Sequence, residues 1–134
     1  MDFVYDLTVP ANTSAASLKE LEIDVGTGIV HLVEIEIPRG CKGMVYGAIR
    51  QGLHQVWPTN PDGAYHSDGR VYSARDHYGI IPGDPSLVLQ GWSPGTTYDH
   101  TVQFRISVLP EEVMEPWHAQ EGLLTRLLRA LGVR

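Results

Sequence analysis

Hydrophobic and polar residues alternate along most of the first 110 positions, with the period of two that is typical of a β-strand with one buried face. The clearest runs are residues 3–9 and residues 29–37. In the first run, Phe3, Tyr5, Leu7 and Val9 share one side. In the second run, one face carries Ile29, His31, Val33, Ile35 and Ile37, and the other carries Val30, Leu32, Glu34 and Glu36.

Further strands are expected at intervals of about 8–12 residues, separated by turns rich in Gly and Pro. They are predicted at residues 21–25, 43–50, 53–57, 70–73, 86–92 and 99–109, with 64–85 as the least regular stretch. Because no strand alternates with a helix, an α/β nucleotide-binding fold is not indicated. The pattern predicts an all-β fold, an antiparallel β-sandwich with a jelly-roll-like arrangement, over residues 1–110.

The period changes to that of a helix after Pro110. Residues 111–134 are therefore expected to form a helical tail that contains an amphipathic α-helix. Its apolar side would carry Trp117, Leu123, Leu124, Leu127, Leu128 and Leu131. An apolar stripe of this kind packs either on the sandwich of its own chain or on another chain.

Composition narrows the function classes. At 134 residues the chain is expected to hold one core, and its net charge of −6 argues against binding to nucleic acid. The single cysteine, Cys41, excludes an intrachain disulfide and a zinc site with several cysteines. Residues 1–6 do not resemble a secretory signal, and no apolar run reaches the length of a membrane span. We therefore expect synthesis in the cytoplasm and no membrane contact.

No motif indicates catalysis. Residues 91–95 match the pattern G-x-S-x-G, but the nucleophile of that motif needs a following helix, and residues 97–109 have the pattern of a strand. Ser93 is therefore predicted to lie in a turn. The six histidines lack metal-ligand spacing, so no metal, no cofactor and no catalytic residue is expected. The chain is predicted not to be an enzyme.

The aromatic residues leave a second interpretation open. Trp57 and Trp92, together with several tyrosines, could form a platform for sugar rings, as in a carbohydrate-binding or adhesion module. Exposure decides between the two interpretations. Buried indole rings favour a scaffold, whereas coplanar exposed rings favour sugar binding.

Three segments, residues 5–13, 55–63 and 98–102, resemble small β-rich proteins encoded in tailed-phage structural gene clusters. The resemblance extends over residues 5–109. It implies a virion component, made in the host cytoplasm, that acts as a capsid decoration or cement protein or as a minor head or tail protein. Its partners would be copies of itself and a major capsid or other virion protein, and no catalytic residue is implied.

Contacts between chains are expected at two places. Residues 10–17 are small and uncharged, so they are interpreted as an extended arm or loop that could add a strand to a neighbour. The leucine stripe of the tail would supply the apolar contact. The predicted interface residues are Ala11, Asn12, Thr13, Ser14, Trp117, Leu124, Leu127, Leu128 and Leu131.

Overall fold

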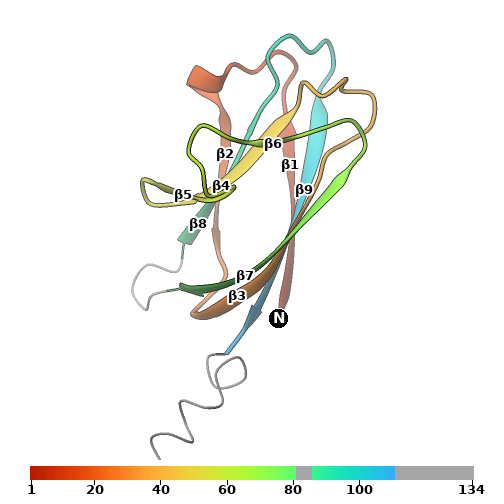
Figure 1. The fold of residues 1–134 in the computed structure, drawn as a ribbon. Helices are drawn as coiled ribbons and strands as arrows, with labels where there is room; N and C mark the ends of the chain where they lie inside the picture. Colours follow the sequence, from red (N-terminus) through yellow and green to blue (C-terminus); the bar gives the residue numbers. More distant parts are fainter. Residues whose placement is uncertain (81–85, 111–134) are drawn as a thin grey trace, which may run out of the picture.

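Two antiparallel β-sheets pack face to face in the computed structural model, which describes residues 1–80 and 86–110 (Figure 1). The first sheet has the strand order β1-β9-β3-β7, and the second has the order β2-β8-β4-β5, with β6 paired to β4. The strands are β1 (Asp2–Val9), β2 (Lys19–Asp24), β3 (Gly28–Glu36), β4 (Tyr46–Gln51), β5 (His54–Trp57), β6 (Tyr65–His66), β7 (Val71–Ile80), β8 (Ser86–Trp92) and β9 (His100–Leu109). The expected all-β antiparallel sandwich is confirmed, whereas the predicted tail helix lies outside the described residues.

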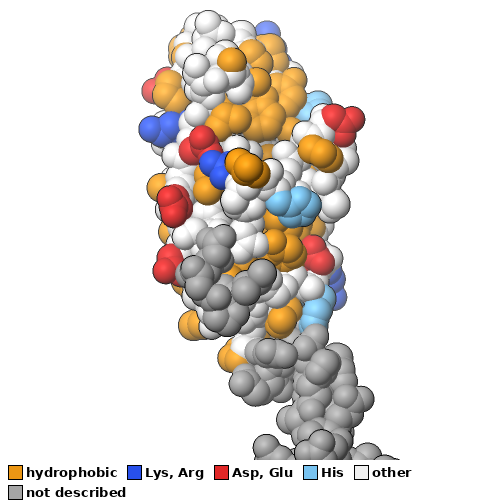
Figure 2. All heavy atoms as spheres, turned by 90° about the vertical axis from the view of Figure 1, so that its left-hand side faces the viewer, with side chains coloured by type: hydrophobic (Ala, Val, Ile, Leu, Met, Phe, Trp, Pro, Cys, Tyr) orange, Lys and Arg blue, Asp and Glu red, His pale blue; other side chains and the backbone are white. Residues whose placement is uncertain are grey.

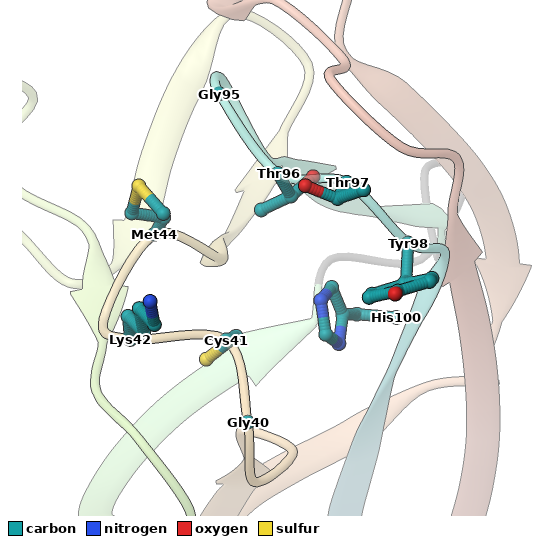
Figure 3. A pocket seen from close by; sticks show the side chains of 9 residues that line it. All are labelled: Gly40, Cys41, Lys42, Met44, Gly95, Thr96, Thr97, Tyr98 and His100. Carbon is teal, nitrogen blue, oxygen red and sulfur yellow. The ribbon is translucent and has the colours of Figure 1, made fainter.

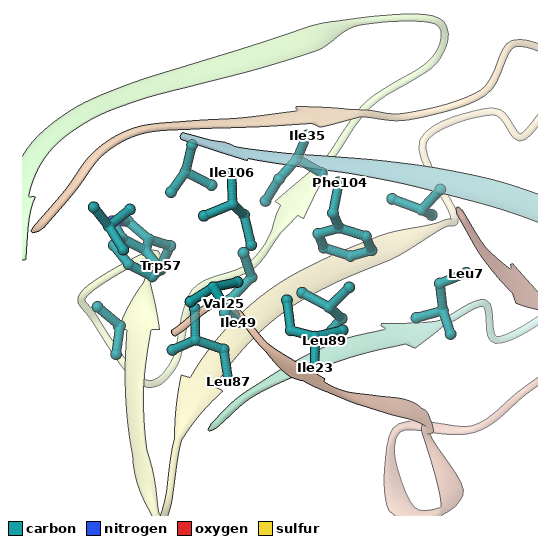
Figure 4. Close-up of a cluster of buried hydrophobic side chains, with 14 of the residues drawn as sticks. Leu7, Ile23, Val25, Ile35, Ile49, Trp57, Leu87, Leu89, Phe104 and Ile106 are labelled. Carbon is teal, nitrogen blue, oxygen red and sulfur yellow. The ribbon is translucent and has the colours of Figure 1, made fainter. Parts of the chain in front are cut away.

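The core lies between the sheets and is built from the inward-facing residue of each alternating pair. Side chains of the two sheets point toward one another in Figure 4, where Ile35 and Phe104 belong to the first sheet and Ile49 and Leu89 to the second. All four are 0% exposed. Full burial of a side chain of this size contributes about 1.5–3 kcal/mol, so the buried side chains between the two sheets are the main source of stability.

A β-bulge in β3 corrects one sequence prediction. Between Val30 and Leu32, β3 carries one more residue than β9, namely His31. The extra residue shifts the alternation, so Val30 is fully buried and His31 is half-exposed. Of the residues predicted to share one face, Ile29, Val33, Ile35 and Ile37 are buried and His31 is not. Val30 takes the place of His31 in the core.

β7 corrects a second prediction. A short strand was expected at residues 70–73, but β7 runs for 10 residues, from Val71 to Ile80. The expectation fell short because the alternation breaks at Arg75, Asp76 and His77, three exposed polar residues in succession where β7 has two residues opposite one of β3. The Asp76 carboxylate bonds to Trp57, as described below.

The ends of the sandwich differ. The β1–β2, β3–β4 and β8–β9 loops gather at the upper end in Figure 1, whereas Met1 and the end of β9 lie at the lower end. A single 3₁₀ turn, η1 (Ala15–Ser17), belongs to the β1–β2 loop. Within the described parts of the chain, no helix is long and apolar enough to cross a membrane.

Candidate functional site

Three rings stand in one row on the outer face of the second sheet. Tyr46 of β4 is the cross-strand partner of Trp92 on β8 and of His66 on β6. The Tyr46 and Trp92 rings are parallel within 5°, with centroids 5.6 Å apart, and the His66 ring lies 4.7 Å from Tyr46 on the other side. Cross-strand partners on one face stand close enough for their side chains to stack, so strand register creates this row.

A cleft of about 380 Å³ lies beside the row. It is bounded by the aromatic row on one side and by the loop between β5 and β6 on the other. Figure 2 looks onto the side of the molecule that carries the second sheet, where hydrophobic side chains gather in patches between charged ones. The residues that line the cleft are Tyr46, Gln55, Pro61, Asp62, Gly63, Ala64, His66 and Trp92.

The side chain of Gln55 holds the loop wall of this cleft. Its Nε2 donates hydrogen bonds of 2.9–3.0 Å to the backbone carbonyls of Pro58, Asn60 and Gly63. A Cβ on Gly63 would lie 2.3 Å from Asn60 Nδ2, so a larger residue there would displace the Asn60 side chain. The wall is therefore shaped before any ligand arrives.

Polar groups stand at the rim of the cleft. Asp62 and His66 are both exposed, and one carboxylate oxygen of Asp62 accepts a hydrogen bond of 3.2 Å from Asn60 Nδ2. An aromatic lining with a few fixed polar groups is the usual composition of a small-molecule site. Among residues 1–80 and 86–110, no three His, Cys, Asp or Glu side chains come together in a way that could hold a metal ion.

The two tryptophans of the sandwich have different surroundings. Trp57 is 2% exposed and its Nε1 donates a hydrogen bond of 3.0 Å to Asp76 Oδ2, so it belongs to the core. Trp92 is half-buried, parallel to Tyr46 and part of the cleft wall. The exposure criterion therefore assigns Trp57 to the scaffold and leaves Trp92 as the ring available to a ligand.

A second, smaller hollow of about 160 Å³ lies between the β3–β4 and β8–β9 loops. Figure 3 shows Cys41 and Lys42 on one side of it and Tyr98 on the other, with His100 between them. The Cys41 thiol is buried, and its single S–H is shared between the Ser67 carbonyl oxygen at 2.9 Å and the Pro38 carbonyl oxygen at 3.3 Å. The thiol is thus held by its own chain.

Ser93 lies in the β8–β9 turn, as the sequence predicts, and strand β9 follows it. The side chain is 0% exposed. Its Oγ donates to the Pro10 carbonyl at 2.9 Å and accepts from the Thr13 backbone N–H at 3.4 Å. A hydroxyl with both bonds inside the protein acts as a tie between two loops and is not presented to a substrate.

The segment Ala11–Ser14 is bound to its own chain. The Ala11 backbone N–H donates a hydrogen bond to Asp99 Oδ1 at 2.8 Å, and Asn12 Oδ1 accepts one from the Gly95 N–H at 2.8 Å. The φ of +55° at Asn12 turns the chain back on itself, a conformation that Asn tolerates better than most residues. Of the two interpretations, the loop is therefore right and the extended arm is wrong, while contact of this loop with a neighbouring chain stays a prediction.

The predicted interface residues keep the status of predictions. Asn12 and Ser14 are exposed, while Ala11 and Thr13 are half-buried. The remaining predicted contacts, Trp117, Leu124, Leu127, Leu128 and Leu131, lie outside the described residues.

Sequence reasoning singled out Trp92 but not the residues that make it part of a site. Tyr46 and His66 meet it only through strand register, and Gln55 acts through the backbone of a loop. The dense turn signal at residues 58–63 predicts that loop, but no sequence signal reports that it faces an aromatic row.

Comparison with known proteins does not assign the chain to a family. No protein-family model matches the chain, and no curated protein matches it. Among solved structures, the Yersinia pseudotuberculosis-derived mitogen (YPM) has 7% identity and a TM-score of 0.45, over 81% of this chain and 86% of that one. PirA has 12% identity and a TM-score of 0.43, over 80% and 95%. Similarities this low leave function to be argued from the residues of this chain.

Proposed function

We propose that this chain is a non-enzymatic structural protein of a virus particle, a capsid decoration or cement protein or a minor virion subunit. It works through protein–protein contacts with copies of itself and with a major capsid or other virion protein. The resemblance of residues 5–13, 55–63 and 98–102 to phage structural proteins motivates this proposal.

The order of the strands is the observation that supports it. β1, β3, β7 and β9 lie in one sheet and β2, β4, β5 and β8 in the other, so most consecutive connections cross between the sheets. We infer a jelly roll from this order, an arrangement that recurs in viral capsid domains and in lectins. This support is an analogy of fold, and it concerns the scaffold and not a chemical step.

The tail supplies the contact in this proposal. Residues 111–134 follow strand β9, which ends at Leu109 beside strand β3. Leu124, Leu127, Leu128 and Leu131 lie at helical spacing, and burial of each contributes about 1.5–3 kcal/mol before the entropy of association is subtracted. Repetition around a particle then adds avidity.

Deletion of residues 116–134 tests the proposal. Thermal unfolding and sedimentation of the full chain and the truncated chain are compared at equal concentration. We expect an unchanged unfolding temperature and a loss of assembly, because the tail acts between chains. A truncated monomer that unfolds much earlier would mean that the tail packs on its own sandwich, and unchanged assembly would contradict the proposal.

A further inference from the structure

We propose that the cleft beside Tyr46 and Trp92 binds a pyranose sugar. The inference concerns a surface that the proposed virion contacts do not use. It stands on the geometry of the cleft alone, so it holds or fails independently of the structural role.

The aromatic row offers the apolar part of such a site. Tyr46 is stacked on Trp92 and lies against the tilted His66 ring on its other side, so both of its ring faces have an aromatic neighbour. The two end rings each have one face turned away from Tyr46, and both line the cleft. A pyranose presents a face of C–H groups that packs on such a ring, and the Pro61 ring adds an apolar group on the loop wall.

The rim offers the polar part. Asp62 is exposed, and its Oδ1 accepts a bond from Asn60 Nδ2, which fixes the direction of the carboxylate. The exposed His66 ring stands on the opposite wall. Sugar hydroxyls can donate to the carboxylate and pair with the imidazole, bonds that a wholly apolar ligand cannot form.

The size and stiffness of the cleft agree with a small ligand. Its volume of about 380 Å³ is at the lower end of the range for small-molecule sites, about 300–1,000 Å³. The three hydrogen bonds from Gln55 hold the loop wall in place, so binding needs little ordering of the protein.

The test is a titration of the full chain followed by ¹H–¹⁵N NMR, with the Trp92 indole N–H as the reporter. Four free sugars serve as probes: glucose, galactose, mannose and N-acetylglucosamine. We expect at least one of them to shift the Trp92 indole signal together with the Gly63 and Ala64 amides. Decaproline is titrated in parallel, because aromatic grooves also bind polyproline segments.

Three variants locate the binding. Trp92→Ala removes an end ring and Asp62→Asn removes the charge of the rim carboxylate, and we expect each to weaken sugar binding by about tenfold or more. For Trp92→Ala the amides of Gly63 and Ala64 serve as reporters. Tyr98→Ala is the matched control, because Tyr98 is an aromatic ring that is 75% exposed but lies at the other hollow. It should bind as the unaltered chain does.

The proposal is overturned if none of the four sugars shifts the Trp92 indole, or if decaproline shifts it and the sugars do not. It is also overturned if Asp62→Asn binds the sugar as tightly as the unaltered chain. Asp62 is on the surface, so this variant keeps the test decisive even if Trp92→Ala does not fold.

Discussion

The indole Nε1 of Trp57 donates a hydrogen bond to Asp76 Oδ2 at 3.0 Å, which ties β5 of the second sheet to β7 of the first. Trp57 is 2% exposed, and the Tyr78 ring meets it edge-on with centroids 5.2 Å apart. A buried indole N–H without an acceptor destabilises a protein. Asp76 is exposed and lies where β7 departs from regular pairing with β3, between the pairs Val30–Tyr78 and Leu32–Arg75, and from there its carboxylate reaches the indole.

Asp76→Ala should lower the free energy of unfolding by about 1–3 kcal/mol, because it leaves the buried indole N–H without a partner. Asp76→Asn should lower the free energy of unfolding by less, since its amide oxygen can still accept the hydrogen bond. Urea unfolding at neutral pH measures both variants.

A double-mutant cycle provides the control for this bond. In a Trp57→Phe background the indole N–H is absent, so Asp76→Ala should change stability by no more than about 0.5 kcal/mol. An equal loss in both backgrounds would mean that Asp76 acts through something other than Trp57.

Gly91→Ala should destabilise the sandwich by about 1–3 kcal/mol. A Cβ at this position would lie 2.6 Å from Val9 Cγ2 and 3.2 Å from Leu7 Cδ2, in a fully packed part of the core. Its cross-strand partner Gly47 is the matched control, because a Cβ there would meet its nearest neighbour, Phe104, at 3.6 Å, an ordinary contact. Measured by chemical denaturation, the free energy of unfolding of Gly47→Ala should be clearly higher than that of Gly91→Ala. The reverse order would contradict the packing described here.

Ser93→Ala should lower the free energy of unfolding by about 1–3 kcal/mol, because the Pro10 carbonyl and the Thr13 N–H lose their common partner. Thr97→Ala, an exposed position in the same loop, should change it by no more than about 0.5 kcal/mol.

The same serine should not react with a fluorophosphonate probe. The reason is that its hydroxyl is buried and bonded to the β1–β2 loop. Mass spectrometry of the treated chain checks this, and a phosphonate adduct on Ser93 would show that the hydroxyl is accessible and activated.

Stability should decline at alkaline pH partly through Tyr65. Burial, and secondarily the charge of Asp76, raises the pKa of the Tyr65 phenol above its ordinary value of 10.0. The folded state thus favours the protonated phenol, and this contribution is complete below about pH 10 and is lost as pH rises through the folded-state pKa. The unfolding free energy of Tyr65→Phe should therefore fall less steeply above pH 10 than that of the unaltered chain. Equal slopes would contradict this assignment.

The parts of the fold that could be predicted from sequence are those with uninterrupted alternation. β1 and β9 follow a period of two over their whole length, so their predicted bounds lie within one residue of those observed. β7 was predicted too short because Arg75, Asp76 and His77 are polar and exposed in succession, and His31 was assigned to the wrong face of β3 because it is an extra residue. Both departures arise from partners distant in sequence.

The candidate site was less predictable than the fold for the same reason. Trp92 could be recognised as a candidate ring from its type alone. Its stacking on Tyr46 depends on the pairing of two residues that lie 46 positions apart in the sequence, and the loop wall depends on a side chain of β5 that bonds to carbonyls. Hydrogen bonds to backbone leave no residue-type signature in a sequence.

The mass of the native assembly tests the central proposal most directly. The chain has a mass of 14.8 kDa, so native mass spectrometry of the full chain distinguishes a monomer from a repeated assembly. If the chain is a structural subunit that contacts copies of itself through its tail, the main species should be an integral multiple of that mass. A variant with Leu124, Leu127, Leu128 and Leu131 replaced by Ser should have the mass of a monomer. A full chain that stays a monomer of 14.8 kDa at every concentration measured would contradict the proposal.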